Sequence, residues 1–146
     1  IRTLAKMVDF VSVGSNDLTQ YLLAVDRNNP RVANLYSAFH PAVLAALQQV
    51  VTAAKEEKKP VSICGEMAGD PGAAILLMAM GYDVLSMNAS TLLKVKSVIR
   101  SVTMDAAQDL LDQVMELDDA QMIRSAVDLA LFNAGVDRLL RSSRTN

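Results

Sequence analysis

The sequence predicts an α/β fold in which parallel strands alternate with helices. Short apolar strand-like runs occur three times, over residues 9–14, 61–64 and 84–88, and helical patterns separate them. The segments between these runs are long enough to be crossover connections, which join parallel strands. The first two strand candidates end in polar side chains, as is typical where a site forms at the carboxyl ends of strands.

The first strand candidate lies between two short helical segments. Residues 1–8 fit the end of a helix, residues 9–14 fit the strand, and residues 17–25 fit a helix with an apolar stripe. Residues 26–39 follow as a long polar loop. Loops of this length inside a compact α/β unit are often functional.

The longest helix is predicted to begin at Pro41, because proline suits the first helical position. His40, the single histidine, precedes it and is interpreted as a capping residue rather than a catalytic one. Apolar residues then recur at steps of three and four and predict one buried face, made of Val43, Leu44, Leu47, Val50, Val51 and Ala54. The charged run 55–59 and Pro60 end this helix.

The second strand candidate, residues 61–64, precedes a helix with clear boundary signals. We expect Asp70 to cap this helix, Pro71 to occupy its first position and Gly81 to end it. Nearly every residue between these boundaries is apolar, which predicts a deeply buried helix.

The third strand candidate, residues 84–88, is followed by a helix over about 91–100. Three strands are too few to close a barrel or to protect the edges of a sheet. We therefore interpret residues 1–102 as the second part of a larger barrel and residues 103–146 as the C-terminal helices of the same domain.

The last third of the chain shows helical patterns alone. Thr103 is expected to cap a helix over 104–117, with the inward residues Ala107, Leu110, Leu111, Val114 and Met115. Asp118 begins a capping-box pattern for a helix over 119–134. A short basic tail over 136–144 follows.

The bulk composition excludes several classes of protein. With 146 residues, 51% hydrophobic and 21% charged, the chain is long and apolar enough to form one globular core. A net charge of −2 gives no basic patch for nucleic acid. No apolar run reaches the roughly 20 residues that span a membrane, and residues 1–8 do not fit a signal peptide. The single cysteine excludes a disulfide framework and indicates a cytoplasmic protein, and the initial Ile indicates a piece of a longer one.

Asn16 and Asp17 directly follow the first strand candidate and its final Gly14. Each has an ordinary structural interpretation, since Asn16 could be a turn residue and Asp17 a helix cap. As a pair at a strand end, they offer the hard oxygen ligands that Mg²⁺ prefers.

Cys64 ends the second strand candidate and precedes Gly65 and Glu66. Most lone cysteines are small buried hydrophobic residues. A glycine that lets a substrate approach and an acidic neighbour favour an acid–base or nucleophilic role instead. Arg27, beside Asp26 in the long loop, is by default a solvated surface residue, and its alternative role is a clamp for phosphate or carboxylate.

The two strand-end motifs, Gly14–Arg27 (GSNDLTQYLLAVDR) and Cys64–Asp70 (CGEMAGD), together resemble those of the phosphoenolpyruvate-utilising enzymes. The resemblance is greatest to the Enzyme I group of the bacterial phosphotransferase system. Within that group, the nitrogen-related branch is the most similar in three further segments, Asp26–Asn29 (DRNN), Arg31–Tyr36 (RVANLY) and Leu85–Asn88 (LSMN). The resemblance runs from about residue 8 to residue 100, and more loosely to the end.

This resemblance implies a role for each candidate residue. Asn16 would contact the phosphate of phosphoenolpyruvate, Asp17 would ligate Mg²⁺ and Arg27 would clamp the phosphoryl group. Cys64 would donate a proton to the methylene carbon of the enolate, which gives pyruvate. Positioning and charge neutralisation, which phosphoryl transfer mainly requires, agree with these roles.

The resemblance also implies a fold and partners. The fold is a TIM (β/α)₈ barrel, of which this chain would supply strands six to eight and the final helices. The parent enzyme would transfer phosphate to a histidine outside this chain and then to an HPr-like carrier, and would be a homodimer. Two alternatives stay open: a fragment of a pyruvate phosphate dikinase or phosphoenolpyruvate synthase, and an oligomerisation module that is inactive when isolated.

Overall fold

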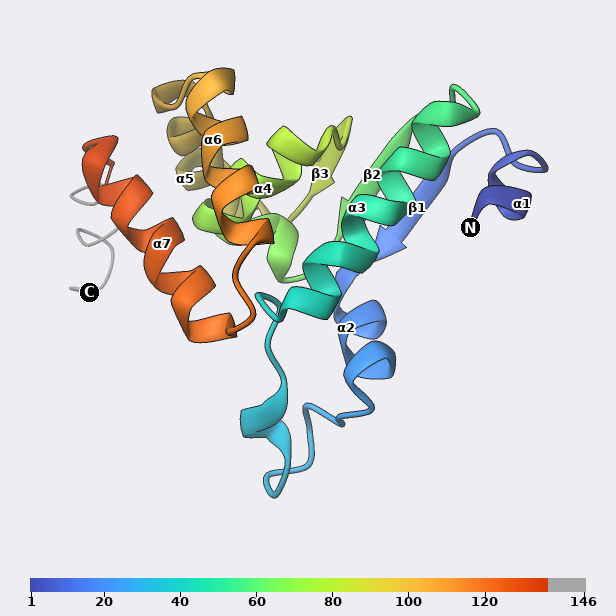
Figure 1. Cartoon of the computed structure of the whole chain (residues 1–146), viewed down its shortest axis with the longest axis horizontal. Coiled ribbons are helices and arrows are strands. Elements are labelled where there is room, and N and C mark those ends of the chain that lie inside the picture. Colours follow the sequence, from blue (N-terminus) through green and yellow to red (C-terminus); the bar gives the residue numbers. More distant parts are fainter. Residues whose placement is uncertain (137–146) are drawn as a thin grey trace.

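The computed structural model of the chain describes residues 1–136. Within this part, three strands alternate with helices and a group of helices follows the last strand (Figure 1). In chain order the elements are α1 (Arg2–Ala5), β1 (Val11–Gly14), α2 (Ser15–Leu23), η1 (Ala33–Leu35), α3 (Pro41–Glu56), β2 (Val61–Cys64), η2 (Met67–Gly69), α4 (Pro71–Met80), β3 (Val84–Ser86), α5 (Ala89–Ser101), α6 (Met104–Met115) and α7 (Ala120–Asn133), where η marks a short 3-10 helix.

The three strands form one parallel sheet in the order β1-β2-β3. The α/β class and the parallel arrangement predicted from the sequence are therefore confirmed. The predicted bounds of β2 are also correct, whereas β1 and β3 are shorter than expected. The register pairs Gly14 of β1 with Cys64 of β2, and Cys64 with Ser86 of β3.

The two faces of this sheet differ in burial. Val13 and Ile63, which are paired across β1 and β2, are buried in the main hydrophobic core with residues of α3 and α4. Ser12 and Val84, which belong to the next row of the sheet, are exposed. The helices thus cover one face, as Figure 1 shows for α3 in front of β1 and β2, and leave the other face open.

The predicted boundaries of α3 and α4 are confirmed. The His40 Nδ1 atom accepts a hydrogen bond from the Ala42 N–H at 3.1 Å, so His40 is the cap of α3. Asp70 caps α4, Pro71 is its first residue and Gly81 ends it in the left-handed conformation, with φ of 98°. Seven of the residues of α4 are buried, as predicted: Gly72, Ala73, Ala74, Ile75, Leu76, Leu77 and Met80.

Three details of the helices differ from the predictions. Helix α2 begins at Ser15 and its N-cap is Gly14, so the interpretation of Asp17 as a cap is wrong. Met115 is 38% exposed rather than inward-facing, because α6 ends at this residue. The cap of α7 is Asp119 and not Asp118, since the Asp119 carboxylate accepts the N–H groups of the next helical turn.

Other features of the C-terminal part agree with the predictions. Thr103 caps α6 by accepting a hydrogen bond from the Ala106 N–H at 3.2 Å. Helix α6 packs mainly on α4, and α7 contacts both of them. Within residues 1–136, no helix is both long enough and apolar enough to cross a bilayer. The predicted basic tail lies outside the described residues except for Val136.

Candidate functional site

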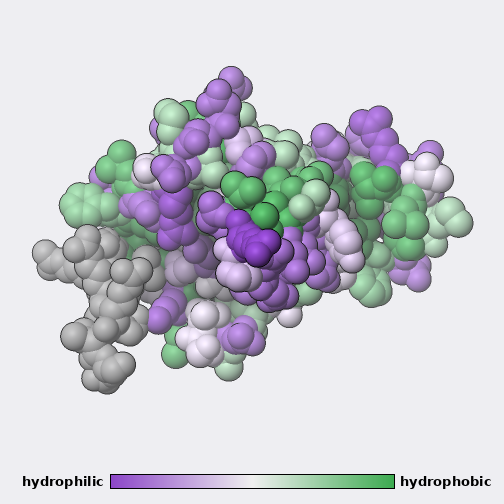
Figure 2. All heavy atoms as spheres, turned by 90° about the horizontal axis from the view of Figure 1, so that it is seen from below, coloured by the Kyte–Doolittle hydropathy of each residue, from purple (hydrophilic) through white to green (hydrophobic). Residues whose placement is uncertain are grey.

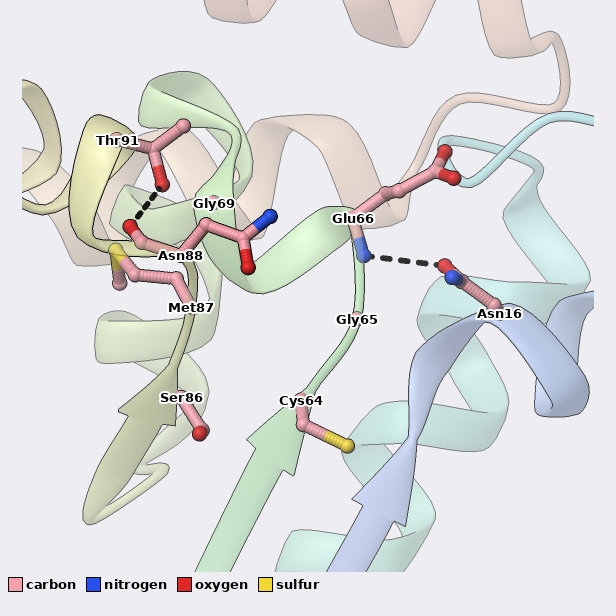
Figure 3. Close-up of a pocket in the computed structure, with 9 residues that line it drawn as sticks. All are labelled: Asn16, Cys64, Gly65, Glu66, Gly69, Ser86, Met87, Asn88 and Thr91. Atoms are coloured by element: carbon pink, nitrogen blue, oxygen red, sulfur yellow. Dashed lines mark hydrogen bonds between the residues drawn. The ribbon is translucent and has the colours of Figure 1, made fainter.

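The carboxyl ends of the three strands meet at one edge of the sheet. Gly14, Cys64 and Ser86 are the last residues of β1, β2 and β3, and the register places them side by side in one row. A cavity of about 580 Å³ opens above this row (Figure 3). It is lined by Asn16, Cys64, Gly65, Glu66, Gly69, Ser86, Met87, Asn88 and Thr91.

The first wall of the site is the start of α2, which follows β1 without a loop. Asn16 and Asp17 therefore lie in the first helical turn, where the exposed N–H groups favour a negative charge. Asp17 is exposed to solvent, and its carboxylate lies beside Gly14: a Cβ atom at Gly14 would be 3.7 Å from Asp17 Oδ2. Gly14 thus leaves the end of β1 open to the Asp17 carboxylate.

The second wall is the turn after Cys64, and it is joined directly to the first. The Glu66 N–H donates a hydrogen bond to Asn16 Oδ1 at 3.1 Å. Gly65, with φ of 103°, lies against α2, because a Cβ atom there would be 2.4 Å from Ser15 Oγ. The Cys64 thiol is exposed and points toward β1, the strand that precedes Asn16 (Figure 3).

The long loop after α2 contacts both of these walls. Arg27 Nη1 forms an ion pair with Glu66 Oε1 at 3.2 Å, and the Tyr36 hydroxyl donates to the Asn16 carbonyl at 3.5 Å. Asp26 and Arg27 are both exposed, as the default interpretation predicted, and each has a partner other than its neighbour. Asp26 accepts a hydrogen bond from the Asn28 N–H within its own turn, at 2.9 Å.

The third wall was missed by the sequence analysis. Ser86, Met87 and Asn88 follow β3, and Thr91 lies in the first turn of α5. The Thr91 hydroxyl donates to the Asn88 carbonyl at 3.0 Å, which closes this turn. The signal was present, because a third strand candidate also ended in polar residues, and parallel strands end at the same edge.

The structure brings together some of the predicted site residues more closely than others. Asn16 and Cys64 line one cavity, whereas Asp17 and Arg27 do not line it and lie next to Gly14 and Glu66. The described residues contain no cluster of three or more acidic, His or Cys side chains that could hold a metal alone. The amide and thiol that line the cavity, together with the Arg27 guanidinium beside Glu66, can bind a small anion and supply a proton.

The comparisons with known proteins agree with these motifs. Residues 1–104 match the family described as PEP-utilising enzyme, PEP-binding domain. A protein from Salmonella typhimurium named "phosphoenolpyruvate-dependent phosphotransferase system" is 43% identical over 138 residues, which are 94% of this chain and 18% of that protein. A phosphoenolpyruvate-protein phosphotransferase from Haemophilus influenzae is 44% identical over 125 residues, 86% of this chain and 22% of that protein.

A third relative, the multiphosphoryl transfer protein 1 of Escherichia coli strain K12, is 48% identical over 118 residues, 81% of this chain and 14% of that protein. The chain thus spans about a fifth or less of the length of these curated relatives. The family match and the high identity over most of the chain agree with the resemblance found in the two strand-end motifs. The chain therefore belongs to the PEP-utilising enzyme family, whose PEP-binding domain its residues 1–104 match.

Proposed function

We propose that this chain is the C-terminal part of a phosphoenolpyruvate–protein phosphotransferase. The parent enzyme moves phosphate from phosphoenolpyruvate to a histidine outside this chain, and from there to an HPr-like carrier. One observation supports this most strongly: Cys64 ends β2, and the Asn16–Asp17 pair begins just after Gly14, the residue of β1 that is paired with Cys64 at the same edge of the sheet. The names of the relatives support the same activity.

Asn16 and Arg27 are suited to bind the phosphate group. Because Asn16 Oδ1 already accepts the Glu66 N–H, the Nδ2 group of the same amide is left to donate to an anion. Arg27 is held by Glu66 through an exposed ion pair, which is weak enough for a phosphate to displace. We propose that substrate binding transfers the Arg27 guanidinium from Glu66 to the phosphoryl oxygens, which it can bind in a bidentate manner.

Cys64 is proposed as the proton donor. When the phosphoryl group leaves, the bond between phosphorus and the bridging oxygen breaks, and its electron pair stays on that oxygen as an enolate. The enolate then takes a proton at its methylene carbon from the Cys64 thiol, which gives pyruvate and a thiolate. Solvent restores the proton to the thiolate, because Cys64 is exposed at the cavity.

Asp17 is proposed as a ligand of Mg²⁺. Its exposed carboxylate fits this ion, which proteins commonly hold with one or two carboxylates plus phosphate oxygens and water. Such an ion, when bound, neutralises charge on the phosphate. Asp17 alone supplies one such ligand, so a second protein ligand is expected from outside this chain.

The open face of the sheet supports the proposed barrel. Parallel sheets are normally covered on both faces, yet Ser12 and Val84 are exposed here. We propose that β1, β2 and β3 are strands six to eight of a TIM (β/α)₈ barrel over residues 1–102. Residues 103–146 are proposed as the C-terminal helices of the same domain, with a role in homodimer formation, in a cytoplasmic enzyme.

The metal-ligand role can be tested by calorimetry on the full-length protein. Asp17→Asn is expected to weaken Mg²⁺-dependent phosphoenolpyruvate binding by about tenfold or more, because a charged ligand is lost. Asp9→Asn is the matched control, since Asp9 precedes β1 at the opposite end of the strand. Equal binding by the two variants would contradict the proposed site.

A further inference from the structure

We propose that Arg124 of α7 is a positioning residue that holds two parts of the site at fixed places. These parts are the Cys64–Asp70 segment, which carries the thiol, and the 26–39 loop, which carries Arg27. Arg124 lies beyond the residues that match the family, which end at 104. The consequence for catalysis rests on the proposed function, but the contacts themselves do not.

The first contact is with Asp70, at the end of the thiol segment. Arg124 Nη1 lies 2.8 Å from Asp70 Oδ2, while Asp70 Oδ1 accepts the N–H groups of Gly72 and Ala73 at 2.8 and 2.9 Å. One carboxylate therefore caps α4 and binds α7 at the same time. This fixes the point where the turn after Cys64 enters α4.

The second contact is with Phe39, at the end of the long loop. The Arg124 guanidinium lies over the Phe39 ring, 5.0 Å from its centroid, an arrangement in which the cation and the ring attract each other. Phe39 is buried in the main core, directly before the cap of α3. Arg124 thus contacts the ends of both site segments with one planar group.

Helix α7 packs closely on α4, and this packing fixes the position of the Arg124 backbone. A Cβ atom at Gly72 would lie 2.4 Å from Val127 Cγ1 and 3.5 Å from Leu131 Cδ1. Val127 is buried and lies less than one turn from Arg124 in α7. Close packing at Gly72 therefore sets the distance between the two helices, and the ion pair with Asp70 sets their orientation.

We expect the ion pair between Arg124 and Asp70 to stabilise the structure locally. The Arg124 and Asp70 side chains are 43% and 28% exposed, and partly exposed ion pairs contribute little to global stability. Losing the pair is expected to release the two segments while the rest of the fold stays closed, because proteins open in local units. Amide hydrogen exchange resolved by segment measures such local opening.

The test compares hydrogen exchange in four proteins: the unchanged full chain, Arg124→Met, Arg124→Lys and Asp128→Asn. Arg124→Met is expected to accelerate exchange in residues 64–73 and in the part of the loop next to Phe39, by about two- to fivefold. Arg124→Lys keeps a cation between Asp70 and Phe39 and is expected to exchange at an intermediate rate. Asp128→Asn is the matched control, because Asp128 pairs with Arg124 at 3.1 Å within the same helix and cannot join α7 to another element.

A double variant separates this role from a general loss of packing. Asp70→Asn keeps an oxygen that caps α4 but removes the charge that Arg124 binds. We expect Asp70→Asn to reproduce the acceleration of Arg124→Met in residues 64–73, and the two substitutions together to add nothing further in that segment. The proposal is wrong if the two segments are unchanged in Arg124→Met, if exchange accelerates equally across the chain, or if Arg124→Lys is as fast as Arg124→Met. Hydrogen exchange is measured without substrate, so its outcome does not depend on whether the protein binds phosphoenolpyruvate.

Discussion

At the scale of the residue, the site depends on a glycine that brings two strand ends together. Gly65 has φ of 103°, in the left-handed region that side chains rarely adopt, and it lies against the buried Ser15. Ser15 Oγ has no hydrogen-bond partner among the described residues. A side chain at Gly65 would therefore meet Ser15, which is itself buried.

We expect Gly65→Ala to destabilise the protein by about 2–4 kcal/mol, since backbone strain and a steric clash add together. Gly81→Ala is the matched control, because Gly81 has a similar φ of 98° but its nearest neighbour would be at an ordinary 3.5 Å. The control is expected to cost about 1–2 kcal/mol, from the left-handed backbone alone. Urea unfolding of both variants measures the difference, and equal losses would show that the contact with Ser15 is not tight.

Tyr82 provides a second test at this scale, through its ionisation. Its hydroxyl donates to the Leu47 carbonyl at 3.3 Å, and burial raises the pKa of this phenol well above its usual value near 10. The folded state thus keeps the proton while the unfolded state loses it. Stability from Tyr82 is complete below about pH 10 and falls as the pH rises further, by about 1.4 kcal/mol per pH unit.

The measurement is urea unfolding between pH 8 and pH 11. Tyr82→Phe is expected to reduce the alkaline loss of stability, whereas Tyr21→Phe, at a residue that is 81% exposed, is expected to leave it unchanged. An unchanged alkaline slope in Tyr82→Phe would contradict the raised pKa.

The sequence located the two principal site residues but not their contacts. Asn16 and Cys64 could be predicted because Asn16 closely follows a recognisable strand and Cys64 ends one. The sequence left a cap as one alternative for Asp17, because it does not reveal that the helix starts directly at the strand end and uses Gly14 as its cap. The ion pair of Arg27 with Glu66 joins residues 39 positions apart, so no local pattern could indicate it.

At the scale of the element, Asp83 fixes the start of β2 against α3. Its carboxylate accepts the Lys55 ammonium at 2.6 Å and the Val61 N–H at 2.8 Å. The hydrogen bond from Lys55, followed by that from Val61, lowers the pKa of Asp83. A lowered folded-state pKa gives stability that is present above the unfolded value, near 3.9, and is lost as the pH falls through the folded value.

We therefore expect Asp83→Asn to weaken the loss of stability between pH 5 and pH 2, as measured by thermal unfolding across this range. Asp109→Asn, at an exposed residue of α6, is the control and should keep the acid dependence of the unchanged protein. If both variants lose stability with acid as steeply as the unchanged protein, the carboxylate of Asp83 does not stabilise β2.

The boundaries of elements could be predicted where the signals are local and unambiguous. Asp70, Pro71 and Gly81 each have one structural meaning at the ends of a helix, and all three were placed correctly. Asp118 and Asp119 carry the same signal at adjacent positions. Asp119 is the cap because its backbone is extended, with φ of −126° and ψ of 129°, which the sequence does not reveal.

At the scale of the whole molecule, the sheet is incomplete. One face and the β1 edge are open, and apolar side chains gather at the end of the molecule that carries α1 (Figure 2). Met7 and Phe10, beside the start of β1, are 77% and 63% exposed. Which helices would cover α4 could not be predicted, because this depends on the packing of α6 and α7 and not on any local pattern.

We expect the isolated chain to self-associate and to bind phosphoenolpyruvate weakly or not at all, because exposed edges and apolar patches are sites of association. Sedimentation velocity over a range of protein concentrations measures the first property, and calorimetry with Mg²⁺ measures the second. A concentration-independent monomer, or tight Mg²⁺-dependent binding, would show that the chain is complete as a binding unit.

The proposed activity requires that the Cys64 thiol at the carboxyl ends of the strands protonates the enolate. The most direct test compares Cys64→Ala with Ser62→Ala in the full-length enzyme, since Ser62 lies two residues deeper on the same face of β2. For Cys64→Ala we predict that phosphoenolpyruvate still binds with nearly unchanged affinity while pyruvate formation is abolished, and for Ser62→Ala that both are retained. Normal pyruvate formation by Cys64→Ala would contradict the role of the thiol and the site built around it.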